Sequence, residues 1–200
     1  NPSDAVATDP VPLLIGTNLD EGTLFTLDLP EEITDSQLRR AVESGGHDTD
    51  RVVAAFKAEY PGETNRQLLI HMLGDTLFRS ASLRVADAQA TTDTSVWVYL
   101  FTWQSQGFHG MFGAMHALEI PFVWNMPLEP WGQLLGEGEP WPPDLADRMH
   151  RAWISFVHTG NPNHGGIPDW PRYDTDRRPT MEFGDTSRML DDPQGRTRAG

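Results

Sequence analysis

The segment from Ser95 to Trp103 reads S-V-W-V-Y-L-F-T-W and constrains the fold of this chain more than any other stretch. Its residues are almost all β-branched or aromatic, the types that are enriched in strands. Because no polar face alternates with the apolar one, we expect a strand that is buried on both faces. Strands of that kind are typical of parallel sheets that carry helices on both sides.

Two other segments fit the same sheet. Val11 to Thr17 is a short apolar run that ends at a turn signal, and Thr180 to Phe183 fits a last short strand. Strands that alternate with helices predict an α/β chain with a mainly parallel central sheet flanked by helices. Capping residues and apolar periodicity predict these helices over roughly 36–44, from Asp48 or Asp50 to Tyr60, from Thr64 to about Ala90, and from Asp144 to about Thr159.

Three stretches interrupt this pattern. Gly74 marks a kink or a break within the long helical stretch that starts at Thr64. Residues 125–143 hold five prolines and three glycines, which predicts a long irregular excursion. The polar residues 185–200 are expected to form a frayed tail.

The composition excludes several classes of function. Lys and Arg number 15 against 29 Asp and Glu, so the formal net charge of −14 disfavours an electrostatic grip on nucleic acid or on an anionic membrane. The absence of cysteine excludes disulfides, thiol catalysis and Cys-ligated metal sites, and it suits either redox environment, so localisation stays open. No apolar run is long enough for a transmembrane helix.

A carboxylate and an imidazole each follow a predicted strand. Glu21 comes after the first strand, and His116 comes after the second on a loop that contains Gly107, Gly110 and Gly113. Ligands and catalytic groups of open α/β sheets gather at the carboxyl ends of the strands. The carboxylate could orient the imidazole, which would then act as a general base. The alternative is that Glu21 is a solvated acid in a turn and that His116 is a histidine hydrogen-bonded within its loop.

The remaining histidines suggest no metal site. His150 and His158 are eight residues apart, or about two helical turns and ~12 Å, which is too far for one shared ion. We interpret His47, His71 and His164 as surface or capping residues, because none stands in the pattern of acids and histidines that a metal site shows in sequence. Glu119, three residues after His116, is either an acid at a helix start or a group that tunes the imidazole.

The nucleophile of an α/β hydrolase has no counterpart in the chain. Such enzymes carry the serine in a G-x-S-x-G turn, followed along the chain by the acid and then the histidine. The nearest match, W-Q-S-Q-G around Ser105, has Trp103 in the first glycine position, and no H-G-G-G-type run occurs to supply oxyanion amides. The order of acid and histidine is that of a C-terminal portion, and the start at Asn1 resembles a chain entered in the middle.

Three motifs together resemble one family. P-L-L-I-G-T-N-L-D-E-G-T-L-F (12–25) resembles the acid motif of type B carboxylesterases, the group that includes cholinesterases and bacterial p-nitrobenzyl esterases. G-A-M-H-A-L-E-I-P-F-V-W (113–124) resembles their histidine motif. A-W-I-S-F-V-H-T-G-N-P-N (152–163) and W-P-R-Y-D (170–174) resemble their closing helix and the loop after it.

The resemblance implies that residues 1–200 are the C-terminal portion of a single α/β-hydrolase domain. It implies Glu21 as the triad acid, His116 as the general base and Glu119 as a buried glutamate beside the histidine. Gly16 and Gly22 match positions that let the chain turn and present the acid, while Phe122 and Trp124 match apolar positions near the pocket wall.

The resemblance also implies the reaction and the partners. The parent protein would hydrolyse a small-molecule carboxylic ester with a serine from its N-terminal part, and no metal or organic cofactor is implied. One alternative is a relative that keeps the fold, has lost the triad and acts in adhesion. A second is a stand-alone binding module, which a start codon next to Asn1 would favour.

Overall fold

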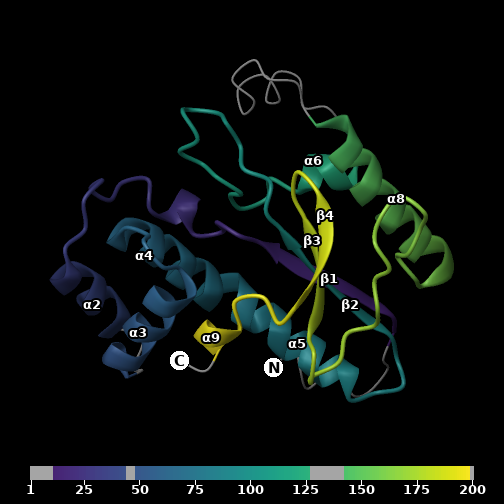
Figure 1. Cartoon of the computed structure of the whole chain (residues 1–200), viewed down its shortest axis with the longest axis horizontal. Coiled ribbons are helices and arrows are strands. Elements are labelled where there is room, and N and C mark those ends of the chain that lie inside the picture. The colour runs from purple at the N-terminus through teal and green to yellow at the C-terminus, as the bar shows by residue number, and fades with distance from the viewer. Residues whose placement is uncertain (1–10, 44–47, 127–141, 199–200) are drawn as a thin grey trace.

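The computed structural model describes residues 11–43, 48–126 and 142–198 (Figure 1). The predicted irregular excursion at 125–143 lies mostly outside the described residues, and so does His47. No described helix is both long and apolar enough to cross a membrane.

A four-stranded sheet organises the described chain. Its strands are β1 (Leu13–Asn18), β2 (Val96–Phe101), β3 (Pro179–Phe183) and β4 (Ser187–Asp191), in the order β1-β2-β3-β4. The first three run parallel and β4 runs antiparallel, which confirms the prediction of a mainly parallel sheet. Leu13 pairs with Val96 and Asn18 with Phe101, so β1 and β2 end at the same edge.

Strand β2 is buried on both faces, as its sequence predicts. Trp97 and Phe101 pack into a core that includes Met149 of helix α8 (Pro143–Thr159). Val96 and Val98 pack on the opposite side with Ala86 of helix α5 (Ser80–Ala90). Alternate side chains of β2 therefore pack into two separate hydrophobic cores, one on each face of the sheet.

A second group of helices packs beyond the sheet, on the side away from α8 (Figure 1). It comprises α2 (Asp35–Glu43), α3 (Thr49–Glu59) and α4 (Asn65–Gly74), which share a core of Leu38, Phe56 and Leu68. Asp48 caps α3 by accepting the Arg51 N–H, and Thr64 caps α4 in a reciprocal box with Gln67. The short elements are η1 (Thr23–Phe25), α6 (Ile120–Val123) and α9 (Gly195–Arg198).

The predicted break at Gly74 is present, and it takes the form of a π-turn. Helix α4 ends at Gly74, the π-turn η2 covers Asp75–Arg79, and α5 follows directly. A side chain at position 74 would place its Cβ 3.2 Å from the Cβ of Glu21. The glycine therefore lets α4 approach the segment that carries Glu21.

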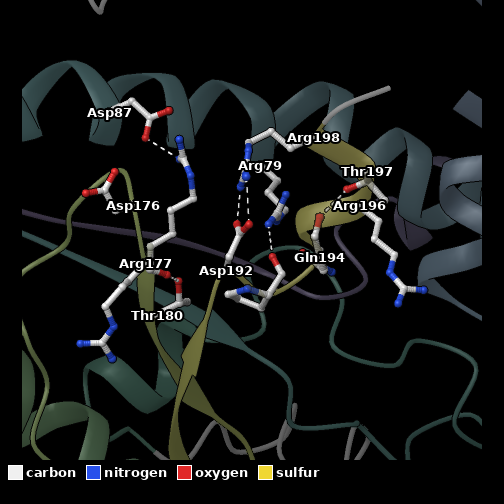
Figure 2. A network of polar contacts seen from close by, with 12 residues as sticks. Arg79, Asp87, Asp176, Arg177, Thr180, Asp192, Gln194, Arg196, Thr197 and Arg198 are labelled. Carbon is white, nitrogen blue, oxygen red and sulfur yellow. Dashed lines mark hydrogen bonds and ion pairs between the residues drawn. The ribbon is translucent and has the colours of Figure 1, made fainter.

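The prediction of a frayed tail over 185–200 is wrong for most of that segment. Residues 187–191 form β4, and α9 follows before the described chain ends at Arg198. Its polar side chains are paired: Arg198 binds Asp192, and Arg79 donates to the Pro193 carbonyl (Figure 2). The polar residues here form a network of ion pairs and hydrogen bonds that holds the segment against α3 and η2.

Candidate active site

Glu21 lies just beyond the carboxyl end of β1 and is 6% exposed. Its Oε1 accepts the backbone N–H of Asn18 at 2.8 Å, which fixes the carboxylate over the end of its own strand. Gly22 follows, and a Cβ there would lie 2.1 Å from the carbonyl oxygen of Ile70 in α4. Only glycine permits this close packing, so the turn and α4 together bury the carboxylate.

His116 lies on the loop that follows β2, and Asp20 ties this loop to the Glu21 turn. Met115 forms an isolated parallel bridge with Asp20. The Oδ2 of Asp20 also accepts the N–H of Ala114 at 2.8 Å. Gly113, with a φ of +55°, takes a left-handed conformation that favours glycine and passes directly over the Asp20 carboxylate.

The structure brings the two predicted residues together. The Nδ1 of His116 lies 2.6 Å from the Oε2 of Glu21. The Glu21 side chain is 8% exposed whereas the His116 side chain is 40% exposed. Because an ionised carboxylate only accepts hydrogen bonds, Nδ1 carries the proton and the Nε2 lone pair is available as a base.

Two aromatic rings flank the imidazole, and sequence patterns alone gave no sign of this arrangement. Phe78 of the π-turn η2 stacks on His116 with a centroid distance of 4.6 Å and an interplanar angle of 27°. Phe25 lies 6.2 Å away at 55°. The π-turn aims Phe78 at the site, and such turns are frequent at functional sites.

Glu119 is joined to the site through Asn18. The Asn18 Nδ2 donates to Glu119 Oε2 at 2.6 Å and to the Met115 carbonyl at 2.7 Å. Burial raises the pKa of Glu119, and the hydrogen bond from Asn18 opposes that rise. Asn18 thus contacts both carboxylates, because its backbone N–H holds Glu21 and its side chain holds Glu119.

Other positions singled out in the sequence have packing roles. A Cβ at Gly16 would lie 2.3 Å from the Tyr99 carbonyl, so this glycine allows close contact with β2. Phe122 is fully buried against Phe101 and Trp103, at centroid distances of 5.2 and 5.3 Å. Trp124 is 65% exposed.

The interpretation of His71 as a surface or capping residue is wrong. The residue is 7% exposed, and its ring stacks on Tyr60 at a centroid distance of 3.9 Å. Its Nε2 lies 2.8 Å from Glu63 Oε2, and its Nδ1 lies 3.8 Å from Asp20 Oδ1. Glu63 lies eight positions before His71, ahead of α4, and Asp20 is much further away along the chain, so the sequence around His71 does not reveal either contact.

His164, interpreted in the same way, does bind backbone groups. Its Nε2 lies 3.0 Å from the Arg148 carbonyl oxygen, and its Nδ1 accepts the Gly166 N–H at 3.1 Å. The His164 ring therefore joins the loop around Gly166 to helix α8.

Comparison with known proteins gives consistent results. A model of the carboxylesterase family matches residues 1–198. The chain is 33% identical over 193 residues to phenmedipham hydrolase of Pseudarthrobacter oxydans, covering 92% of the chain and 38% of the relative. It is 31% identical over 200 residues to para-nitrobenzyl esterase of Bacillus subtilis strain 168, covering 96% of the chain and 38% of that relative.

A solved structure shows the same similarity in three dimensions. The carboxylesterase EST55 of Geobacillus stearothermophilus superposes with a TM-score of 0.82 at 31% identity. The superposition covers 98% of this chain and 41% of that one. The chain therefore spans about two fifths of the length of the proteins it matches.

Proposed function

The chain belongs to the carboxylesterase family, and we propose that it supplies the acid and the base of a Ser-His-Glu triad to a carboxylic ester hydrolase. The observation that carries the proposal is the 2.6 Å contact between His116 Nδ1 and Glu21 Oε2. The contact forms at the carboxyl edge of two adjacent parallel strands, where this class of sheet places its reacting groups. The alternative of a solvated turn acid does not suit a carboxylate that is 6% exposed.

In this proposal the imidazole moves the proton twice. The Nε2 of His116 takes the hydroxyl proton of a serine as its oxygen attacks the ester carbonyl, and then gives that proton to the departing alkoxide. A water molecule next attacks the acyl-serine and loses its proton to the same nitrogen, which passes that proton to the departing serine oxygen, so the carboxylic acid and the free serine are released. Glu21 holds the ring in the required tautomer and stabilises the imidazolium that forms at each step.

The serine belongs, in this proposal, to another part of the parent protein, because the chain has no G-x-S-x-G turn. The substrate is a small-molecule carboxylic ester. Phe25 and Phe78 form an apolar wall on the imidazole, which favours an ester with an aromatic or alkyl group on that side. The names of the relatives, among them a para-nitrobenzyl esterase, fit this choice.

Conversion of each carboxylate to its amide tests the assignment of the acid in the full-length protein. Glu21→Gln should lower kcat by about three to four orders of magnitude, because the amide cannot stabilise the imidazolium. Glu119→Gln should cost about ten- to a hundredfold, the scale of a supporting group. Glu32→Gln, at an exposed position, is the control and should leave kcat unchanged. A greater loss from Glu119→Gln than from Glu21→Gln would reverse the assignment.

A further inference from the structure

Three residues that line one small cavity each carry a buried polar atom without a hydrogen-bond partner among the described residues. These atoms are Asn18 Oδ1, His71 Nδ1 and Gln194 Oε1. Asn18 is 4% exposed, and His71 is buried to a similar extent. The described chain has only two further buried side-chain atoms of this kind, the indole nitrogens of Trp97 and Trp170, and neither lines this cavity.

The convergence matters because buried polar groups are almost always paired. Three unpaired atoms around one cavity therefore point to a polar occupant. The cavity offers about 10 Å³ for the centre of a water molecule, and roughly 10–15 Å³ is what one water requires.

The donors and acceptors around the cavity also suit water. Both amide oxygens are acceptors, and one water molecule has two hydrogens to donate. His71 Nε2 lies 2.8 Å from Glu63 Oε2 and so carries the ring proton, which makes His71 Nδ1 a third acceptor rather than a donor. The two hydrogens of one water therefore pair the two amide oxygens, which makes two of the roughly three hydrogen bonds that a buried water typically forms.

The turn of the C-terminal segment around Gln194 is held in a fixed conformation beside the cavity. Asp192 and Gln194 adopt φ values of +48° and +59°, which are unusual for residues other than glycine. Arg79 donates to the Pro193 carbonyl and Arg198 binds Asp192, so both sides of the turn are fixed (Figure 2). Gln194 lines the cavity, its Nε2 donates to the Tyr60 hydroxyl, and its Oε1 has no hydrogen-bond partner among the described residues. Strained backbone of this kind persists only where the surroundings hold it.

We propose that the cavity is a binding site for one ordered water molecule that joins Gln194 of the C-terminal segment to the Asn18 amide. The water fixes the Asn18 side chain with Oδ1 inward and Nδ2 toward Glu119 and the Met115 carbonyl. Asn18 thereby acts as a positioning residue, since its backbone also holds Glu21. The link from the water to catalysis rests on the proposed function, whereas the water site itself does not.

A high-resolution crystal structure of the full-length protein tests the site. The expected result is one density peak within hydrogen-bond distance of Asn18 Oδ1 and Gln194 Oε1. An empty cavity, or direct hydrogen bonds from these two atoms to other protein groups, would overturn the proposal. This outcome is independent of whether Glu21 and His116 are catalytic.

A pair of variants tests the link to catalysis. Gln194→Met removes the amide oxygen at similar length, and it should abolish the density peak and lower kcat about tenfold with KM unchanged. Gln37→Met is the matched control, because it makes the same change at an exposed position on α2, away from the cavity. It should retain the peak and keep kcat within about twofold of wild type. Wild-type kcat in Gln194→Met without the water, or an equal loss in both variants, would reject the link.

Discussion

Asp20 binds Ala114 twice across the two loops of the site. Its Oδ2 accepts the Ala114 N–H at 2.8 Å, and its own N–H donates to the Ala114 carbonyl at 3.0 Å. Glu21 and His116 are the neighbours of this contact in sequence, one residue and two residues away. The 2.6 Å contact between them therefore depends on a backbone framework as well as on their own side chains.

Loss of the Asp20 carboxylate should loosen that framework. In the full-length protein, Asp20→Ala leaves the Ala114 N–H without its side-chain acceptor, and we expect kcat to fall about ten- to a hundredfold. Steady-state kinetics with a p-nitrophenyl ester measures the loss. Asp28→Ala, at an exposed position beyond η1, is the control. Equal activity of the two variants would show that the loops do not need this contact.

Phe78 should orient the imidazole through its stacking contact. Phe78→Ala removes the ring that lies 4.6 Å from the His116 ring, so the imidazole gains freedom and kcat should fall about tenfold. Leu77→Ala changes an exposed neighbour on the same π-turn and should have little effect. Stopped-flow measurement of acylation compares the two variants directly, and an equal response would assign the effect to the turn rather than to the ring.

The raised pKa of Glu119 predicts a pH dependence of stability. Burial is the main cause, so the folded state binds a proton more tightly than the unfolded state does. The stability contributed by protonated Glu119 is therefore present at low pH, and it is lost as the pH rises above the ordinary glutamate pKa of 4.5 through the raised folded pKa. Glu119→Gln removes this titration.

Urea unfolding of wild type and Glu119→Gln between about pH 4 and pH 8 measures the effect through the difference in the free energy of unfolding. As the pH rises, the free energy of unfolding of Glu119→Gln should increase relative to that of wild type. A difference that stays constant over the whole range would show that the Glu119 pKa is the same in the folded and unfolded states.

The described sheet leaves β1 paired on one side only, since it lies at the end of the strand order. A chain with this open edge and no nucleophile turn should show no esterase activity alone and should be poorly stable. A serine-directed phosphonate should not label the isolated 200 residues, and labelling should appear when the rest of the parent protein is supplied. Cooperative unfolding alone, with no labelling after complementation, would favour an independent module.

Part of this architecture could be predicted because the signal is local. The apolar run from Val96 to Phe101 predicts a strand that is buried on both faces. Glu21 and His116 each follow a predicted strand, and the acid precedes the histidine as it does in α/β hydrolases. Their meeting at one sheet edge then follows from parallel pairing. Their catalytic role stays a prediction.

The rest depends on contacts between distant segments. Asn18 and Asp20 look like turn residues until the loop around Ala114 is packed against them. Phe78 on the π-turn stacks on His116 on the loop after β2, two positions that lie far apart in the sequence. The segment from Ser187 onward looks like a tail because some of its partners are remote in the sequence: Arg148 of α8 donates to Ser187, and Arg79 of η2 donates to the Pro193 carbonyl. Local composition carries none of this information.

The most direct test of the account is the rate of acylation in His116→Ala of the full-length protein, followed as the first-turnover release of p-nitrophenolate. His158→Ala, at the exposed end of α8, serves as the matched histidine control. The account predicts that His116→Ala slows acylation by at least about a thousandfold while the control acylates at the wild-type rate. Acylation of His116→Ala at the wild-type rate would contradict the assignment of His116 as the base.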